Sequence, residues 1–167
     1  YHNDKSILFF NGEFKNVKDF RISPFNQTLH SGYGVFEGLR AYNAQQGPHI
    51  FKVKRHFERL SKSAEKLNIQ MPYSVQEMIN FAYELIERNE LREAYIRPLV
   101  FMDKNMTLRA HDADKPNILM TCWKWNRYYP SNHLKVLVSS WRRPHPKTMP
   151  VDIKATGNYI NSILATR

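Results

Sequence analysis

The chain has 167 residues, 42% of them hydrophobic and 13% aromatic, so it can form one domain, or one domain and part of another. It contains no apolar run long enough to span a membrane, and its first residues lack the layout of a signal peptide. A single cysteine, Cys122, excludes an internal disulfide. We therefore expect a cytoplasmic protein with no membrane partner.

The net charge of +10 comes from lysines and arginines that are spread along the chain, with Arg142-Arg143 among the densest clusters. Such a charge can serve nucleic-acid binding, a solvated surface that meets small anions, or a longer chain whose other part is acidic. The sequence contains none of the usual nucleic-acid-binding motifs, so we favour the last two. A basic nucleic-acid-binding module stays open as the alternative from another functional class.

The N-terminal residues predict strands joined by a tight turn. Ile7–Phe10 and Glu13–Lys15 form a hairpin around Asn11-Gly12, a residue pair that favours a type I′ turn. Residues 18–34 are expected to be irregular. Val35–Tyr42 is expected to be one strand, because its pattern alternates. The residues that share one face of this strand are Phe36, Gly38, Arg40 and Tyr42.

Two amphipathic helices are expected next, after a turn at residues 45–48. The first spans Val53–Leu67, and its apolar stripe consists of Val53, Phe57, Leu60, Ala64 and Leu67. Arg59 lies off this stripe, where an arginine is solvated unless an anion lies against it. The second helix follows Pro72 with Ser74 as its N-cap. Its expected inner face consists of Val75, Ile79, Ala82 and Ile86.

Glu93–Met102 is expected to be a strand in which Arg97 is unusual. This arginine shares a face with large, mostly apolar side chains, among them Tyr95 and Phe101. A guanidinium in a dry environment needs an anion or a hydrogen-bonding partner, because leaving it unpaired there is costly. The other interpretation is that this face of the sheet is open to solvent, and the sequence does not decide between the two.

The remaining pattern divides the chain into two domains. Pro116–Trp123 and His133–Trp141 are expected to be strands, and the tyrosine- and proline-containing stretch between them is typical of a linker. We therefore expect a first domain over residues 1–126, a linker over 127–132, and the beginning of a second domain over 133–167. The expected fold class is α/β (α+β).

Lys154 is the candidate nucleophile of this chain. Three prolines between positions 144 and 150 stiffen the approach to it, and Thr156-Gly157-Asn158 suits a tight turn or the start of a helix. A lysine held in such a place can attack a carbonyl group. Most lysines before helices are instead solvated surface charges, so spacing alone does not establish the role.

Five motifs in order resemble those of the branched-chain-amino-acid aminotransferases, which are pyridoxal-phosphate enzymes of fold type IV. The resemblance extends over nearly the whole chain and implies a small N-terminal α/β domain followed by the start of a larger cofactor-binding domain. The motifs are F-F-N-G-E-F (9–14), H-S-G-Y-G-V-F-E-G-L-R-A-Y (30–42), H-F-E-R-L (56–60), A-Y-I-R-P-L-V-F (94–101), and K-A-T-G-N-Y-I-N-S-I-L-A (154–165) after V-S-S-W-R-R-P (138–144).

The resemblance implies pyridoxal 5′-phosphate as the cofactor and no metal. Lys154 would bond to its aldehyde, Arg59 would hold its phosphate, and Tyr159 would lie near its phenolic oxygen. Once an amino acid displaces Lys154, the freed amine would act as the base that moves the α-proton.

The resemblance also implies the substrates, which are branched-chain L-amino acids with 2-oxoglutarate. Tyr95 would meet the α-carboxylate, and Arg97 with Tyr128 would meet the distal carboxylate of glutamate. The residues implied for the apolar pocket are Phe36, Trp125 and Tyr159. A homodimer or higher homo-oligomer is implied as well. A D-amino-acid aminotransferase or an aminodeoxychorismate lyase is the alternative within the same fold.

Two departures from the family pattern affect these expectations. Where some relatives carry a tyrosine that reaches into the neighbouring subunit's site, this chain has Ser31, with Tyr33 close by. Family members are also much longer. We therefore expect residues 1–167 to lack the acid that pairs with the pyridine nitrogen, to be inactive alone, and to leave Lys154 without a sheet that holds it in place.

Overall fold

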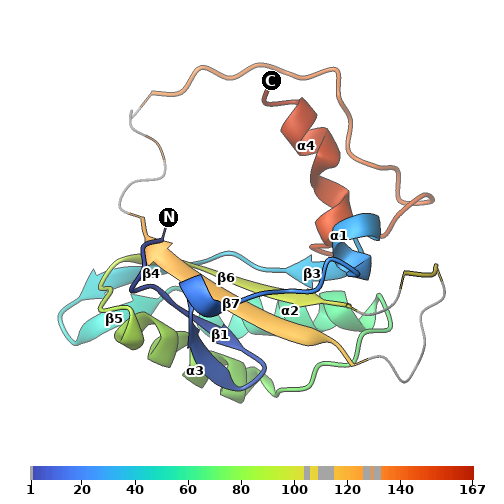
Figure 1. The fold of residues 1–167 in the computed structure, drawn as a ribbon. Helices are drawn as coiled ribbons and strands as arrows, with labels where there is room; N and C mark the ends of the chain where they lie inside the picture. The colour runs from blue at the N-terminus through green and yellow to red at the C-terminus, as the bar shows by residue number, and fades with distance from the viewer. Residues whose placement is uncertain (1, 104–105, 109–114, 126–128, 130–132) are drawn as a thin grey trace.

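The computed structural model consists of a mixed helix and strand fold built on one sheet (Figure 1). Within the described residues the sheet has seven strands in the order β2-β1-β7-β6-β4-β5, with β3 also paired to β6, and every pairing is antiparallel. Helices α2 and α3 cover one face of the sheet. The residues described are 2–103, 106–108, 115–125, 129 and 133–167.

The elements have the following bounds. The strands are β1 (Ile7–Phe10), β2 (Glu13–Asn16), β3 (Gly34–Phe36), β4 (Leu39–Ala44), β5 (Gly47–Ile50), β6 (Ala94–Phe101) and β7 (Asn117–Lys124). The helices are η1 (Val17–Asp19), α1 (Gln27–Ser31), α2 (Val53–Glu65), α3 (Val75–Arg88), η2 (Thr156–Tyr159) and α4 (Ile160–Leu164), where η marks a 3₁₀-helix.

The N-terminal hairpin is confirmed, and its turn has the expected chemistry. Strands β1 and β2 pair directly, with Phe10 opposite Glu13. The two residues between them, Asn11 and Gly12, have φ values of 49° and 93°. A type I′ turn requires positive φ at both positions, and asparagine and glycine adopt it at low cost.

The prediction that residues 18–34 are irregular was wrong for the short helix α1. The Asn26 side chain accepts a hydrogen bond from the backbone N–H of Leu29 and caps the helix start. Gly32, with a φ of 68°, ends the helix in the left-handed conformation. An asparagine cap followed six residues later by glycine is a signal that could have predicted this turn of helix.

The single strand expected over Val35–Tyr42 is divided into β3 and β4. Both pair with β6 in one continuous register, and the break falls at Glu37, whose N–H donates to the carbonyl of Pro98 (3.0 Å). Proline has no N–H to return, so the ladder is interrupted there. The predicted alternation still holds, because Val35, Glu37, Leu39 and Ala41 are buried while the residues between them are not. The turn expected over residues 45–48 begins at Gln45 as predicted but is shorter, since β5 begins at Gly47.

The two long helices and their apolar faces are largely confirmed. In α2, Phe57, Leu60 and Ala64 are buried and Val53 packs against the core, as does Leu67 just beyond the end of the helix. Ser74 caps α3 through a capping box with Glu77. The most buried residues of α3 are Met78, Ala82, Leu85 and Ile86, so its inner face is rotated from the predicted one. No helix in the described ranges is long and apolar enough to cross a membrane.

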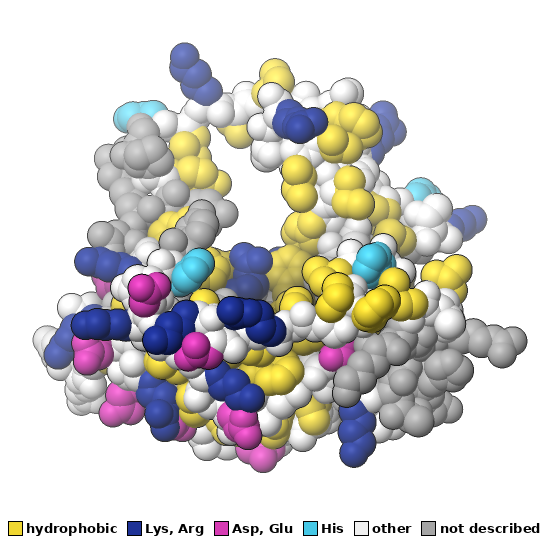
Figure 2. Space-filling model, in the orientation of Figure 1, with side chains coloured by type: hydrophobic (Ala, Val, Ile, Leu, Met, Phe, Trp, Pro, Cys, Tyr) yellow, Lys and Arg dark blue, Asp and Glu magenta, His cyan; other side chains and the backbone are white. Residues whose placement is uncertain are grey.

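The prediction of a strand over His133–Trp141 was wrong. These residues have no regular structure, and Val136, Leu137 and Val138 are 93%, 94% and 96% exposed. A strand needs a neighbour for its backbone N–H and C=O groups, and no strand of the described residues pairs with this stretch. Residues 133–150 instead arch away from the sheet, the chain returns to β3 before η2, and α4 then leads away from the sheet again toward the C-terminus (Figure 1). The space-filling view shows an opening under this arch (Figure 2).

Candidate functional site

Lys154 lies on a segment that is bonded to the free edge of β3. The N–H of Phe36 donates to the carbonyl of Lys154 (3.0 Å), and Val35 forms an isolated β-bridge with Ala155. On the other side, the N–H of Lys154 donates to the hydroxyl of Ser63 on α2 (3.3 Å). The expectation that no sheet would hold this lysine was therefore wrong, because its segment bonds to the edge of strand β3.

The turn that follows Lys154 packs closely against the end of α1. The Thr156 hydroxyl donates to the carbonyl of Gly32 (2.6 Å). A Cβ at Gly32 would lie 2.9 Å from the Cα of Gly157, so the two backbones can approach this closely because residue 32 is glycine. Asn158 is buried, and its amide donates to the carbonyl of Pro150 (2.9 Å). These contacts fix the direction in which the Lys154 side chain leaves the chain.

The Lys154 amine lies between two aromatic rings. Its Nζ donates to the Tyr159 hydroxyl (2.7 Å) and lies 4.4 Å from the centre of the Phe36 ring and 4.6 Å from that of Tyr159. The two rings are in edge contact, with centroids 5.0 Å apart. The structure thus brings together three residues that the sequence analysis named. The guanidinium of Arg143, 5.4 Å from the Tyr159 ring, covers the same tyrosine.

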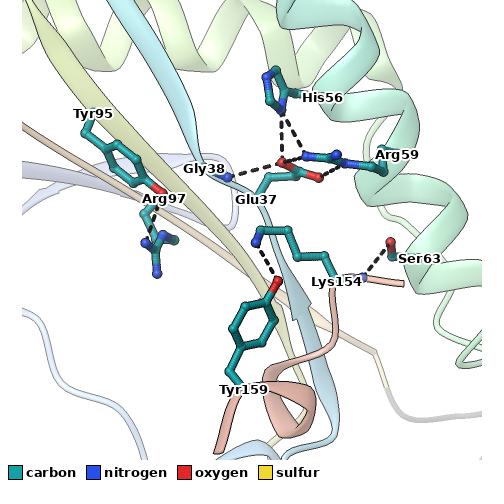
Figure 3. A network of polar contacts seen from close by, with 9 residues as sticks. All are labelled: Glu37, Gly38, His56, Arg59, Ser63, Tyr95, Arg97, Lys154 and Tyr159. Carbon is teal, nitrogen blue, oxygen red and sulfur yellow. Dashed lines mark hydrogen bonds and ion pairs between the residues drawn. The ribbon is translucent and has the colours of Figure 1, made fainter. Parts of the chain in front are cut away.

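Arg59 forms an ion pair with Glu37, a residue that the sequence analysis did not name. Its Nε and Nη2 donate to the two carboxylate oxygens at 2.5 and 2.8 Å. His56 Nδ1 lies 2.9 Å from the same carboxylate, and the N–H of Gly38 donates to it at 3.2 Å (Figure 3). The missed signal was the alternation itself, which puts this carboxylate on the helix-covered face between Val35 and Leu39.

Spacing on α2 explains why these contacts gather beside Lys154. His56, Arg59 and Ser63 follow each other at intervals of three and four residues, so they line one flank of the helix. The first two contact Glu37, and the third bonds the backbone of Lys154. Figure 3 accordingly shows the Lys154 side chain beside the Glu37–Arg59 pair.

The buried carboxylate of Glu37 is held in its charged form. Burial by itself raises the pKa of this group, but the hydrogen bonds from His56 and Arg59 and the charge of Arg59 outweigh that effect, and the pKa falls to about 2. Glu37 therefore stays ionised through the physiological pH range.

Arg97 and Tyr95 form a second polar group on the face opposite the helices. Arg97 Nη2 donates to the Tyr95 hydroxyl (3.0 Å), and its guanidinium lies 5.0 Å from the Phe36 ring. Its Nε is buried without a hydrogen-bond partner among the described residues. Phe36 thus separates and contacts two cations, Lys154 and Arg97.

Gly38 leaves the room that the Tyr95 side chain fills. A Cβ at this position would overlap the Tyr95 hydroxyl and lie 2.8 Å from its Cζ. Tyr95 is further covered by Trp123 and Trp125, with ring centroids 5.0 and 5.3 Å away. The expected pocket residue Trp125 therefore lies next to Tyr95, and Tyr128 lies outside the described residues.

The residues that depart from the family pattern lie at the end of α1. Ser31 is exposed. The Tyr33 hydroxyl donates to the carbonyl of Leu67 at the end of α2 (2.5 Å), so it is engaged within its own chain. This bond points Tyr33 toward the helix layer.

Comparison with known proteins identifies a family for this arrangement. The family model described as amino-transferase class IV matches residues 34–167. The branched-chain-amino-acid aminotransferase of Pseudomonas aeruginosa is 38% identical over 164 residues, which are 95% of this chain and 53% of that protein.

Solved structures with the same fold carry the same name. The crystal structure of the Escherichia coli branched-chain amino acid aminotransferase matches with a TM-score of 0.90 and 32% identity, over 96% of this chain and 54% of that one. The T.th. enzyme complexed with N-(5′-phosphopyridoxyl)-L-glutamate matches with a TM-score of 0.91 and 33% identity, over 98% and 55%. The chain thus spans about half the length of the relatives it matches.

The ionised state of Glu37 predicts a loss of stability in acid. The folded pKa of about 2 lies below the unfolded value of 4.5, so the stabilisation is complete above about pH 4.5 and is lost as the pH falls toward 2. It amounts to about 3 kcal/mol at most, and less in practice because the half-exposed Arg59 is screened by solvent. Urea unfolding at several pH values should show that the free energy of unfolding falls less steeply between pH 4.5 and 2 in Glu37→Gln than in the wild type. An unchanged dependence would refute the assignment.

The close approach of Gly38 and Tyr95 predicts that Gly38→Ala destabilises the protein by about 1–3 kcal/mol, because the new methyl group overlaps the tyrosine. Thermal unfolding measures the loss. The double variant Gly38→Ala/Tyr95→Phe should recover part of it, since the overlapping hydroxyl is gone. Wild-type stability of the single variant would contradict this packing.

Proposed function

The chain belongs to the amino-transferase class IV family, and we propose that it carries part of the active site of a pyridoxal 5′-phosphate-dependent branched-chain-amino-acid aminotransferase. The reaction would exchange an amino group between branched-chain L-amino acids and 2-oxoglutarate. The observation that carries the proposal is the amine of Lys154, held between Phe36 and Tyr159 on a segment bonded to β3. The names of the relatives support it, as does the phosphopyridoxyl compound in the T.th. structure.

The side chains around Lys154 suit this cofactor. Arg59 uses two of its five N–H groups on Glu37, which leaves an edge for a phosphate. Lys154 offers the amine that would bond to the aldehyde, and the Tyr159 hydroxyl would lie near the phenolic oxygen. When bound, the cofactor supplies an electron sink for the bonds at the α-carbon.

Lys154 would serve in turn as the attachment point and as the base. Its Nζ is hydrogen-bonded to the Tyr159 hydroxyl at 2.7 Å, which orients the amine. The Phe36 ring, 4.4 Å away, excludes water from one side of it. An amine that is oriented and partly shielded in this way can take the substrate's α-proton and return it to another carbon atom.

The face opposite the helices would bind the substrates. Phe36 and Trp125, with Tyr159, would contact the apolar side chain of the amino acid, and Tyr95 would meet its α-carboxylate. Arg97 would bind the distal carboxylate of glutamate. Its Nε is buried and has no hydrogen-bond partner among the described residues, so it could donate to this carboxylate. Tyr128 keeps its proposed role as a helper of Arg97.

The domain division, the oligomer and the location also remain proposals. We propose a first domain over 1–126, a linker over 127–132 and the start of a cofactor-binding domain over 133–167, in a cytoplasmic homo-oligomer. The backbone hydrogen bond from the N–H of Phe36 to the carbonyl of Lys154 connects the proposed second domain to the proposed first one. Partners other than amino acids and 2-oxo acids are not needed for this function.

The proposal predicts that the intact protein transaminates leucine with 2-oxoglutarate and does not act on D-alanine. Lys154→Ala should lower this activity by at least about a hundredfold, because the variant lacks both the attachment point and the base. Borohydride reduction followed by peptide mapping should fix the cofactor to Lys154 in the wild type alone.

Circular dichroism of Lys154→Ala should match the wild type, which separates chemistry from folding. Turnover of D-alanine in preference to leucine would favour a D-amino-acid aminotransferase instead. Cofactor fixed to the variant chain would identify another lysine.

Arg97→Ala should raise the KM for 2-oxoglutarate about tenfold, since a charged hydrogen bond to the distal carboxylate is lost. The half-reaction with leucine should change little, because leucine has no distal carboxylate. Single-turnover kinetics of each half-reaction measure the difference. Arg21→Ala is the matched control, since Arg21 is exposed and bonds only backbone carbonyls among the described residues. Equal damage to both half-reactions would contradict the role of Arg97.

A further inference from the structure

The Glu37 carboxylate is a buried charge that the fold maintains at a cost. Its side chain has no exposed surface, and its neighbours on the same face, Val35 and Leu39, belong to the apolar core. A carboxylate in such surroundings is strongly disfavoured unless it is paired and hydrogen-bonded. The proposed reaction does not use it, so its partners must explain its presence.

Those partners leave Arg59 with a defined orientation. The carboxylate accepts hydrogen bonds from Nε and Nη2, which form one edge of the planar guanidinium. The second edge, formed by Nη1 and the other proton of Nη2, stays available, and Nη1 has no hydrogen-bond partner among the described residues. The Arg59 side chain is 56% exposed, whereas Glu37 is fully buried. Arg59 therefore has one edge fixed inside the protein and one edge open.

His56 fixes the carboxylate from the other side. Its Nδ1 lies 2.9 Å from Glu37, which requires the proton on that nitrogen, since an ionised carboxylate can only accept. Nδ1 then cannot accept from Arg59, and the 3.5 Å contact between them is not a hydrogen bond. Glu37 thus accepts three hydrogen bonds from one flank of α2, two from Arg59 and one from His56, and a fourth from the backbone N–H of Gly38. With both oxygens engaged, it cannot rotate away from Arg59.

We propose that Glu37, held by His56, is a positioning residue that fixes the guanidinium of Arg59 so that its open edge binds the phosphate of the cofactor beside Lys154. This inference rests on the proposed function, in which Arg59 is the phosphate ligand. Glu37 itself does not touch the cofactor. It acts by removing the rotational freedom of a long, half-exposed arginine before the phosphate arrives.

The opposite possibility is that Glu37 competes with the phosphate for Arg59. A phosphate that drew Arg59 away would leave the buried carboxylate with only His56 and the Gly38 N–H, which is costly. The geometry avoids this conflict, because the two anions use different edges of one guanidinium. The two possibilities predict opposite signs for the removal of the Glu37 charge.

The test compares two probes on the intact protein without cofactor. Spectral titration gives the dissociation constants of pyridoxal 5′-phosphate and of pyridoxal, which lacks the phosphate. Glu37→Gln should weaken binding of pyridoxal 5′-phosphate by about tenfold and leave that of pyridoxal unchanged. Glu84→Gln, which removes a Glu–Arg ion pair on the exposed surface of α3, should alter neither constant.

A double-mutant cycle with Arg59→Ala separates the inference from the proposed function. If Glu37 acts only through Arg59, Glu37→Gln should have no further effect in the Arg59→Ala background. If Arg59→Ala still binds pyridoxal 5′-phosphate more tightly than pyridoxal by the wild-type factor, the proposed role of Arg59 as the phosphate ligand is refuted. If Arg59→Ala weakens the binding of pyridoxal 5′-phosphate and Glu37→Gln does not, only the inference about Glu37 is refuted.

Three other results would also overturn the inference. Tighter binding of pyridoxal 5′-phosphate by Glu37→Gln would show competition, and equal weakening of both probes would show a general structural role. Additive losses in the cycle would show that Glu37 does not act through Arg59. If Glu37→Gln does not fold, Glu37→Asp keeps the buried charge but withdraws it by one methylene, and the same phosphate-specific loss is expected from it; its absence would overturn the inference.

Discussion

The antiparallel register of β3 and β4 against β6 is the constraint on which the site depends. It places Phe36 on the open face and Glu37 on the helix-covered face, although the two residues are adjacent in sequence. Phe36 contacts the Lys154 amine through its ring and bonds the Lys154 carbonyl through its N–H, while Glu37 bonds Arg59. A slip of one residue would exchange the two side chains and separate all of these contacts.

Charge is distributed over the two faces by the same register. On the helix side the buried carboxylate of Glu37 is shared by Arg59 and His56. On the open side Arg97 has Tyr95 and aromatic rings as its described neighbours, and Lys154 lies between rings as well. Among the described residues neither Arg97 nor Lys154 pairs with a carboxylate, which agrees with the proposed binding of anionic ligands there.

The stretch that arches over the sheet shows where local pattern fails. Val136, Leu137 and Val138 are the kind of residues that favour a strand, yet they are almost fully exposed. β-propensity expresses how well a side chain packs on a paired surface, so it predicts little where no pairing strand is present among the described residues. The backbone of Lys154, which follows later in the chain, is fixed in place because the free edge of β3 bonds to its segment.

The sequence by itself determined the hairpin, both long helices, strands β6 and β7 and, through resemblance, the family. It also named Lys154, Arg59 and Tyr159 as candidates for the cofactor site. These follow from turn chemistry, periodicity and motif order, which are local properties. Only the tertiary structure decided that Glu37 pairs with Arg59, that Gly38 makes room for Tyr95, and that the sheet holds Lys154. Each of these contacts joins residues that are distant in sequence, and their partners are chosen by the strand register and by the packing of α2 on the sheet, which no local pattern encodes.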